Sequence, residues 1–309
     1  MDVTVGVGRA GESPVVRRFT HEAMATIFEV HAVHDDGQYA AQAAQEAFAL
    51  LDRLERELSR FLPNSDIGRV NALGEGEATQ VAPTTMECLL IARHLFDMTE
   101  GAFDISIGTG LPSLELDADG CVVRVAAAGV RLDLGGIGKG YAVDLMAELL
   151  EEWELRRALV HGGFSSVLAL DPGADPAGWP LSFSDPAVPG RVLSRLTMRQ
   201  TAFGASGVRK GDHIVDPRTG APARDRRAAW VAVPRPPAAR AGDGGGPRLA
   251  PAAVADALTT AFMLLAPGAI EALCAANPGV EAWLLEAPGE GGRAEAVLRH
   301  LGGRGPAPA

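Results

Sequence analysis

The chain has 309 residues, of which 47% are apolar and 22% are charged, a composition typical of a globular protein. Acidic residues outnumber lysines and arginines by 39 to 28, so the formal net charge is −11. This balance argues against a general DNA- or RNA-binding role, because phosphate backbones need a basic protein face.

Residues 1–16 show no clear periodicity, and we expect them to form a flexible arm before a domain that covers residues 17–301. In the first half of the chain, segments rich in β-branched residues alternate with segments that carry one apolar stripe. Thr84 and Glu87 have the spacing of a capping box at a helix start. The predicted strands here are 26–33, 121–125, 130–134, 157–161 and 166–170, and the predicted helices are 38–59, 84–99 and 141–155.

In the second half, residues 234–251 are rich in Pro, Gly and Arg, and we expect a mobile insertion there because nothing in the segment buries a core. Residues 302–309 are expected to form a flexible tail. The mixture of strands and helices with long loops predicts an α+β fold rather than a regular β-α-β alternation. The predicted strands of this half are 192–198, 230–233 and 282–285, and the predicted helices are 252–265, 269–276 and 293–301.

The cysteines and the N-terminal segment indicate the cellular compartment in which we expect the protein. Cys88, Cys121 and Cys274 form no C-x-x-C pair, and their odd number excludes a complete disulfide framework, so we interpret them as small buried residues in a reducing environment. The N-terminal segment has no signal-peptide pattern, and no stretch approaches about 18 uninterrupted apolar residues. We therefore expect a cytoplasmic protein without a membrane span.

A glycine-rich segment, Leu-Asp-Leu-Gly-Gly-Ile-Gly-Lys-Gly-Tyr at residues 132–141, follows a predicted strand and leads into a predicted helix. Glycines let a backbone approach a ligand closely, and the free N–H groups at a helix start attract phosphate. The spacing fits neither a P-loop nor a dinucleotide-binding fingerprint. Lys139 is one of only two lysines in the chain, which favours a ligand contact, and a merely solvated lysine on a tight turn is the alternative.

Two further segments contain candidate polar groups. Asp256 and Thr260 lie four residues apart, so they share one helix face and form a hard-oxygen pair that suits Mg²⁺. The alternative is that Asp256 caps the helix and Thr260 bonds back to its own backbone. His213 precedes a turn-forming Asp-Pro-Arg-Thr-Gly sequence and is either a general base or a structural residue.

Taken together, these segments resemble one known family, the FAD:protein FMN transferases or ApbE-like proteins. The resemblance runs in the same order from Met24 to about Leu265, over more than three-quarters of the chain. The motifs that carry it are MATIFEV at 24–30, LSRFLPNSDIGRVN at 58–71, TEGAFD at 99–104, DLGGIGKGYAVD at 133–144, HIVDPRTG at 213–220 and DALTTAF at 256–262.

The resemblance implies two packed lobes with a site for FAD and Mg²⁺ at their junction. It implies Mg²⁺-dependent transfer of FMN from FAD to a Thr or Ser hydroxyl of an acceptor flavoprotein, with AMP leaving and His213 as the base. Magnesium would be held by a main-chain oxygen of Gly136 and by Asp256 and Thr260. The FAD contacts would be Met24, Phe61, Ala102, Phe103, Asp104, Asp133 and Lys139.

The chain departs from the family pattern at four positions. Ala25 and Gly138 stand where the family commonly has Gly and Ala, and Phe61 replaces a common Tyr. Phe164 follows the Gly162-Gly163 pair, where many members have an acid. Two alternatives stay open. One is an Mg²⁺-dependent FAD pyrophosphatase that gives free FMN and AMP, and the other, suggested by Ala25 and Phe164, is a flavin-binding protein without catalysis.

Overall fold

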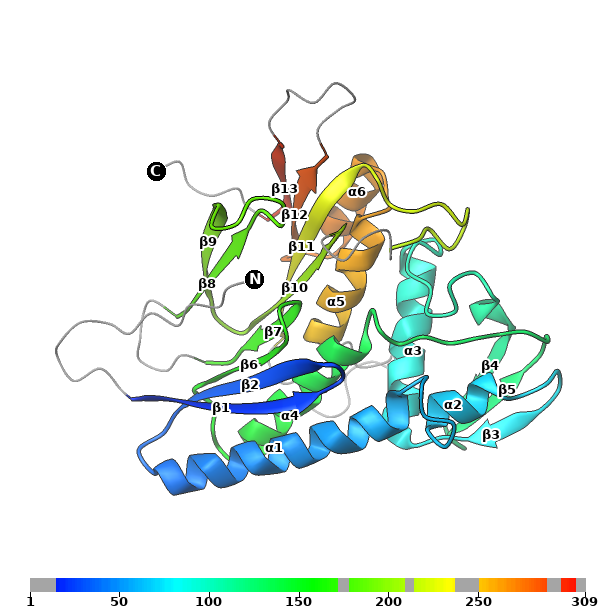
Figure 1. Cartoon of the computed structure of the whole chain (residues 1–309), viewed down its shortest axis with the longest axis horizontal. Helices are drawn as coiled ribbons and strands as arrows, with labels where there is room; N and C mark the ends of the chain where they lie inside the picture. Colours follow the sequence, from blue (N-terminus) through cyan, green and yellow to red (C-terminus); the bar gives the residue numbers. More distant parts are fainter. Residues whose placement is uncertain (1–14, 172–177, 209–213, 237–249, 288–295, 304–309) are drawn as a thin grey trace.

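The computed structural model describes residues 15–171, 178–208, 214–236, 250–287 and 296–303. Its centre is an eight-stranded sheet in the order β1-β2-β6-β7-β10-β11-β12-β13, in which every neighbouring pair is antiparallel (Figure 1). The α+β prediction is confirmed. The strands are β1 Val16–Ala23, β2 Thr26–Val33, β6 Ala158–Gly162, β7 Ser166–Ala169, β10 Thr201–Gly207, β11 Arg226–Pro234, β12 Glu281–Glu286 and β13 Leu298–Gly302.

Different elements pack against the two faces of this sheet. Phe28, Val30 and Ala32 of β2 alternate inward and join the main core, which the helices α1 Gly37–Leu58, α4 Gly138–Glu152, α5 Pro251–Phe262 and α6 Pro267–Ala276 complete. On the other face, the hairpin of β8 Trp179–Ser184 and β9 Val192–Met198 packs over a second, aromatic core that contains Trp230 and Trp283.

The middle of the chain forms a smaller part beside these helices, drawn in cyan in Figure 1. It contains α2 Asp66–Asn71, α3 Pro83–Met98, a short 3-10 turn at Leu111–Ser113, and a sheet of β3 Ala78–Gln80, β5 Val122–Val125 and β4 Leu114–Asp117. Leu89 of α3 and Val123 of β5 belong to the same hydrophobic core as Phe28 of β2, so one continuous core joins both parts.

Several predicted elements are wrong, each for a local reason. Residues 130–134 form no strand, because their backbone bonds to the end of α2 and to a loop instead: Leu132 N donates to the Asn71 side chain at 2.6 Å and Asp133 N donates to Ile105 O at 2.7 Å. The described end of the predicted helix 293–301 is strand β13, in which Leu298 pairs with Leu285 of β12. The short helix α2 follows α1 without having been predicted, and the Ser65 side chain caps it by accepting from Gly68 N.

The predicted boundaries also need correction. Helix α3 has Ala82 as its N-cap and Pro83 in its first turn, and the Thr84 hydroxyl bonds Glu57 at 2.5 Å instead of forming a capping box. Val16, predicted in the arm, begins β1, and Gly302, predicted in the tail, ends β13. The ends of the predicted insertion lie in regular elements, at Pro234 in β11 and Pro251 in α5, whereas 237–249, 1–14 and 304–309 lie outside the described residues.

The cysteine prediction holds for two residues. Cys88 and Cys274 are buried and free, whereas the free Cys121 is partly exposed. Among the helices of the described residues, none has both the length and the apolar character needed to cross a lipid bilayer.

Candidate functional site

A cavity of about 1190 Å³ opens where the large sheet meets the smaller part of the chain. Both parts contribute to its lining, through the β1–β2 turn, the end of α1, the loop after α3, the glycine-rich turn before α4, and α5. Ten of the eleven predicted site residues line this cavity, namely Met24, Phe61, Ala102, Phe103, Asp104, Asp133, Gly136, Lys139, Asp256 and Thr260.

The eleventh, His213, lies outside the described residues. The next residue along the chain, Ile214, is buried and lines the cavity, as do Val215 and Pro217 from the same motif. The motif that contains the predicted base therefore contributes to the cavity wall.

The glycine-rich turn and helix α5 meet at one wall of the cavity. Lys139 Nζ donates to Gly135 O at 2.9 Å and lies 3.4 Å from Asp256 Oδ2, which also accepts from Gly140 N at 3.1 Å. A Cβ atom built on Gly136 would lie 3.6 Å from Thr260 Oγ1, so this backbone comes close to the Thr260 hydroxyl. The fold thus places the Asp256 carboxylate and the Thr260 hydroxyl next to the glycine-rich segment that contains Lys139, although both residues are more than a hundred positions from Lys139 in the sequence.

Asp256 is buried at 3% exposure and lies within α5, not at its start. Burial raises the pKa of its carboxyl above the usual range, while Lys139, the Gly140 N–H and the Ser166 hydroxyl act in the opposite direction. Asp256 is therefore no helix cap. The bond back to the helix backbone, considered above as the alternative role of Thr260, is made by its neighbour: Thr259 Oγ1 donates to Asp256 O at 2.7 Å.

Aromatic rings form another part of the lining. Phe103 is buried, and its ring edge would be 3.3 Å from a Cβ on Gly136, so it packs against the glycine-rich turn. Phe61 is 77% exposed at the cavity, with the Arg60 guanidinium 4.6 Å from its ring centroid. Arg60 also pairs with Asp133 at 3.3 Å. These contacts give the cavity a flat apolar surface next to a cation.

Two of the predicted FAD contacts have their carboxylates engaged within the protein. Asp104 accepts from Ser106 N and Ser106 Oγ at 2.7 Å and from Gly108 N at 2.8 Å, which shapes the loop after α3. Asp133 accepts from Gly135 N at 2.9 Å in addition to its contact with Arg60. Both residues therefore fix the local backbone that lines the cavity.

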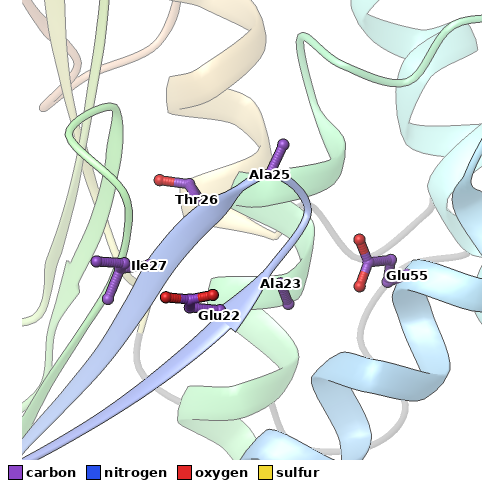
Figure 2. A pocket seen from close by; sticks show the side chains of 6 residues that line it. All are labelled: Glu22, Ala23, Ala25, Thr26, Ile27 and Glu55. Atoms are coloured by element: carbon purple, nitrogen blue, oxygen red, sulfur yellow. The ribbon is translucent and has the colours of Figure 1, made fainter.

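The β1–β2 turn consists of Met24 and Ala25, which have φ values of 50° and 58°. A two-residue hairpin with positive φ at both positions is a type I′ turn, which favours Asn and Gly, so this turn is strained. Figure 2 shows Glu55 of α1 opposite the turn, across a smaller hollow of about 450 Å³. Glu55 Oε1 accepts from Met24 N at 2.8 Å and holds the turn in place.

Sequence reasoning missed several residues of this site. Arg60, Glu55 and Ser206 line the cavity, and Ser206 Oγ lies 2.9 Å from Thr259 Oγ1 and 3.5 Å from Thr260 Oγ1. Ser206 belongs to β10, an unpredicted strand, so no sequence signal connected it to α5. Phe164, noted only as a departure, is 61% exposed and lines the cavity.

The chain matches a family model described as "ApbE family" over residues 24–112 and 109–244. A FAD:protein FMN transferase of Treponema pallidum is 28% identical over 336 aligned positions, which cover 91% of this chain and 88% of the relative. A protein of the same name from Rhodobacter capsulatus is 28% identical, but the match spans only 42% of that relative's length and 59% of this chain.

Solved structures have the same fold. The flavin transferase ApbE from Vibrio cholerae superposes with a TM-score of 0.77 at 19% identity, and the match covers 94% of this chain and 98% of that one. The flavinyl transferase ApbE from Pseudomonas stutzeri superposes with a TM-score of 0.76 at 24% identity and covers 97% and 96% of the two chains. By its family match and its fold, the chain belongs to the ApbE family.

Proposed function

We propose that this ApbE-family protein transfers FMN from FAD to a Thr or Ser hydroxyl of an acceptor flavoprotein and releases AMP. Relatives named FAD:protein FMN transferase support this activity. The observation that carries the proposal is the meeting of Lys139, Asp256, Thr260 and the Gly136 backbone at one wall of a cavity whose volume suits a dinucleotide.

The residues at this wall fit a bound Mg²⁺. A buried carboxylate, a hydroxyl and a main-chain carbonyl are hard oxygen donors of the kind that Mg²⁺ prefers. Asp256, Thr260 and Gly136 would hold the ion. When bound, it would neutralise charge on the pyrophosphate oxygens of FAD.

The protein's own groups contribute to the same step. Lys139 places a positive charge beside Asp256, where it can stabilise the charge that develops as the pyrophosphate breaks. In the transfer, the acceptor hydroxyl oxygen bonds to the FMN phosphorus, the bond from that phosphorus to the AMP oxygen breaks, and AMP takes the electron pair. The hydroxyl proton passes to a base, the role we assign to His213.

The rim of the cavity fits a macromolecular acceptor. Phe164 and Ile107 both line the cavity, and they are 61% and 53% exposed. Exposed apolar side chains at the mouth of a polar site provide contact area for an approaching polypeptide. Hydrolysis by water needs no such surface.

The proposal is tested by incubating the protein with FAD, Mg²⁺ and a candidate acceptor flavoprotein, followed by a denaturing gel. We expect flavin fluorescence that migrates with the denatured acceptor and disappears when its target Thr or Ser is replaced by Ala. Free FMN without labelled acceptor would indicate a pyrophosphatase, and unchanged FAD would indicate a flavin-binding protein. Either result with a proven acceptor would overturn the proposal.

A further inference from the structure

A second cluster of polar side chains lies away from the cavity wall just described. Glu29 and His31 of β2 and His161 of β6 each offer one possible ligand atom, and these atoms all lie within 4.8 Å of one another. His31 Nε2 is 2.9 Å and His161 Nε2 is 3.3 Å from the same oxygen, Glu29 Oε2. The three residues are buried, at 5–9% exposure.

The sheet itself brings these residues together. Glu29 and His31 are two positions apart, so they share one face of β2, and Glu29 is the direct cross-strand partner of His161. This face is opposite to that of Phe28 and Val30, which point into the helix-covered core. The cluster is thus built on paired strands of the central sheet rather than on loops.

The hydrogen bonds of His161 leave its Nε2 free to bind a cation next to Glu29. Its Nδ1 lies 3.0 Å from Gly163 O, which can only accept, so Nδ1 carries the ring proton. Nε2 of the neutral ring then presents a lone pair to the Glu29 carboxylate, which also only accepts. Two acceptors 3.3 Å apart repel each other, and either a proton on His161 Nε2 or a metal ion between Nε2 and the carboxylate relieves this repulsion.

We propose that Glu29, His31 and His161 bind a divalent transition metal ion of the Zn²⁺ type, separate from the magnesium position. Two imidazole nitrogens and one carboxylate oxygen are a ligand set that suits zinc, whereas magnesium prefers oxygen donors alone. The bond between His161 Nδ1 and Gly163 O is the backbone contact that commonly orients a metal-ligating histidine. The inference is independent of the proposed FMN transfer.

Arg18 of β1 explains how the cluster is held without the ion. Its guanidinium bonds both oxygens of Glu29, with Nε 2.6 Å from Oε2 and Nη2 in contact with Oε1. The Arg18 side chain is 60% exposed, so it can move into water without a large penalty. We therefore expect Arg18 to compete with the metal ion for Glu29.

The site has a direct connection to the flavin cavity. His161 is followed by Gly162 and Gly163, and then by Phe164 and Ser165, which line the cavity. A metal ion on His161 would fix the start of this β6–β7 turn through the Gly163 carbonyl. The ion would act as a structural support for the cavity wall and take no part in the transfer.

Binding is tested with Co²⁺ as a spectroscopic probe and Zn²⁺ as competitor, on the tag-free full chain without FAD and with excess Mg²⁺. We expect one equivalent of Co²⁺ with the visible absorption of a tetrahedral N/O site, displaced by Zn²⁺. Glu29→Gln and His161→Gln should each weaken Zn²⁺ binding by about 100-fold or more, because each removes a direct ligand. Arg18→Ala should strengthen it several-fold.

The matched control is His300→Gln. His300 Nε2 lies 2.8 Å from Glu281 Oε2, so this pair has the same chemistry, but no second histidine joins it among the described residues. We expect its Zn²⁺ affinity to match that of the unmodified protein. Should one variant fail to fold, His31→Gln removes the third ligand and gives an independent measurement. The proposal is overturned if the unmodified protein binds no Co²⁺, or if the ligand variants bind Zn²⁺ as tightly as His300→Gln.

Discussion

Asp256 is the residue on which the proposed chemistry depends most, because it is a buried carboxylate that faces the lysine of the glycine-rich turn. Asp256→Asn keeps the size and the acceptor for Gly140 N but removes the charge. We expect the rate of FMN transfer to fall by about 10²–10³-fold and to lose its response to Mg²⁺. Initial rates over a range of Mg²⁺ concentrations measure both effects.

Asp66→Asn is the control for Asp256. Asp66 is also buried and accepts from Ala82 N and the Thr85 hydroxyl at 2.7 Å, but it does not line the cavity. Its replacement should leave the Mg²⁺ response of the rate unchanged. If Asp256→Asn retained full Mg²⁺-dependent activity, the assignment of the magnesium position would be wrong.

Phe61 provides a second test at the level of one residue. Its exposed ring lines the cavity and is expected to stack on a flat part of FAD, so Phe61→Ala should weaken FAD binding by about 5–10-fold. The neighbouring Leu62 is 43% exposed and does not line the cavity, so Leu62→Ala serves as control. Fluorescence titration with FAD gives both dissociation constants, and equal values would contradict the stacking role.

The strained hairpin turn leads to a prediction about stability. Ala25 has a φ of 58°, a conformation that disfavours a residue with a Cβ and suits glycine. Ala25→Gly should therefore raise the free energy of unfolding by about 0.5–1 kcal/mol in urea denaturation. Ala43→Gly, in the regular helix α1, should instead lower it by about 1 kcal/mol or more. A loss of stability in both variants would show that the turn is not strained.

Single residues of the site could be predicted where the residue type and its spacing point to one kind of ligand contact. Lys139, Asp256 and Thr260 were identified from lysine scarcity, helical spacing and motif resemblance, and the structure brings all three to one cavity. Ser206 and Glu55 were not identified, because a serine in a strand and a glutamate on an exposed helix face have no distinctive pattern. Their place at the cavity depends on tertiary packing alone.

At the level of elements, the close approach of α4 and α5 positions the cavity wall. A Cβ atom on Gly140 would lie 2.1 Å from Ala252 O, so Gly140→Ala must push the helices apart. We expect a loss of about 2–3 kcal/mol in the free energy of unfolding, with reduced transfer activity, because Gly140 N also bonds Asp256. Urea denaturation and initial rates measure the two effects.

The control for this prediction is two residues away. A Cβ on Gly138 would meet only Leu134 Cβ at 3.8 Å, an ordinary contact. Gly138→Ala should leave the free energy of unfolding unchanged or raise it by up to about 1 kcal/mol. If both variants lost the same free energy of unfolding, the close contact between α4 and α5 could not be the reason why residue 140 must be glycine.

Helices were easier to predict than strands for a physical reason. The apolar stripe of α1 is a local feature, and its predicted range of 38–59 differs by one residue at each end from Gly37–Leu58. The spacing of Val297, Leu298 and Leu301 also fits a helix, but pairing with β12 and the stack of His300 on Trp283, with ring centroids 4.7 Å apart, favour strand β13. The spacing of apolar residues along the sequence does not reveal such contacts between distant segments.

At the scale of the whole molecule, the cavity depends on segments from nearly every part of the described chain. The family could be predicted because six motifs follow one another in the family's order despite single departures such as Ala25 and Phe61. The sheet order β1-β2-β6-β7-β10 could not be predicted, because the sequence pattern did not indicate β1 and β10 as strands. The junction between the large sheet and the smaller part supplies both the polar wall and the apolar rim. The proposed transfer chemistry and the proposed acceptor contacts therefore both belong to this junction.

The most direct test of the central claim is the ratio of AMP released to flavin covalently bound to the acceptor, measured by chromatography and by absorbance of the denatured acceptor. Transfer from FAD predicts one bound flavin for each AMP, with both products dependent on Mg²⁺ and both lost in Asp256→Asn. AMP accompanied by an equal amount of free FMN, with no flavin on the acceptor, would contradict the account.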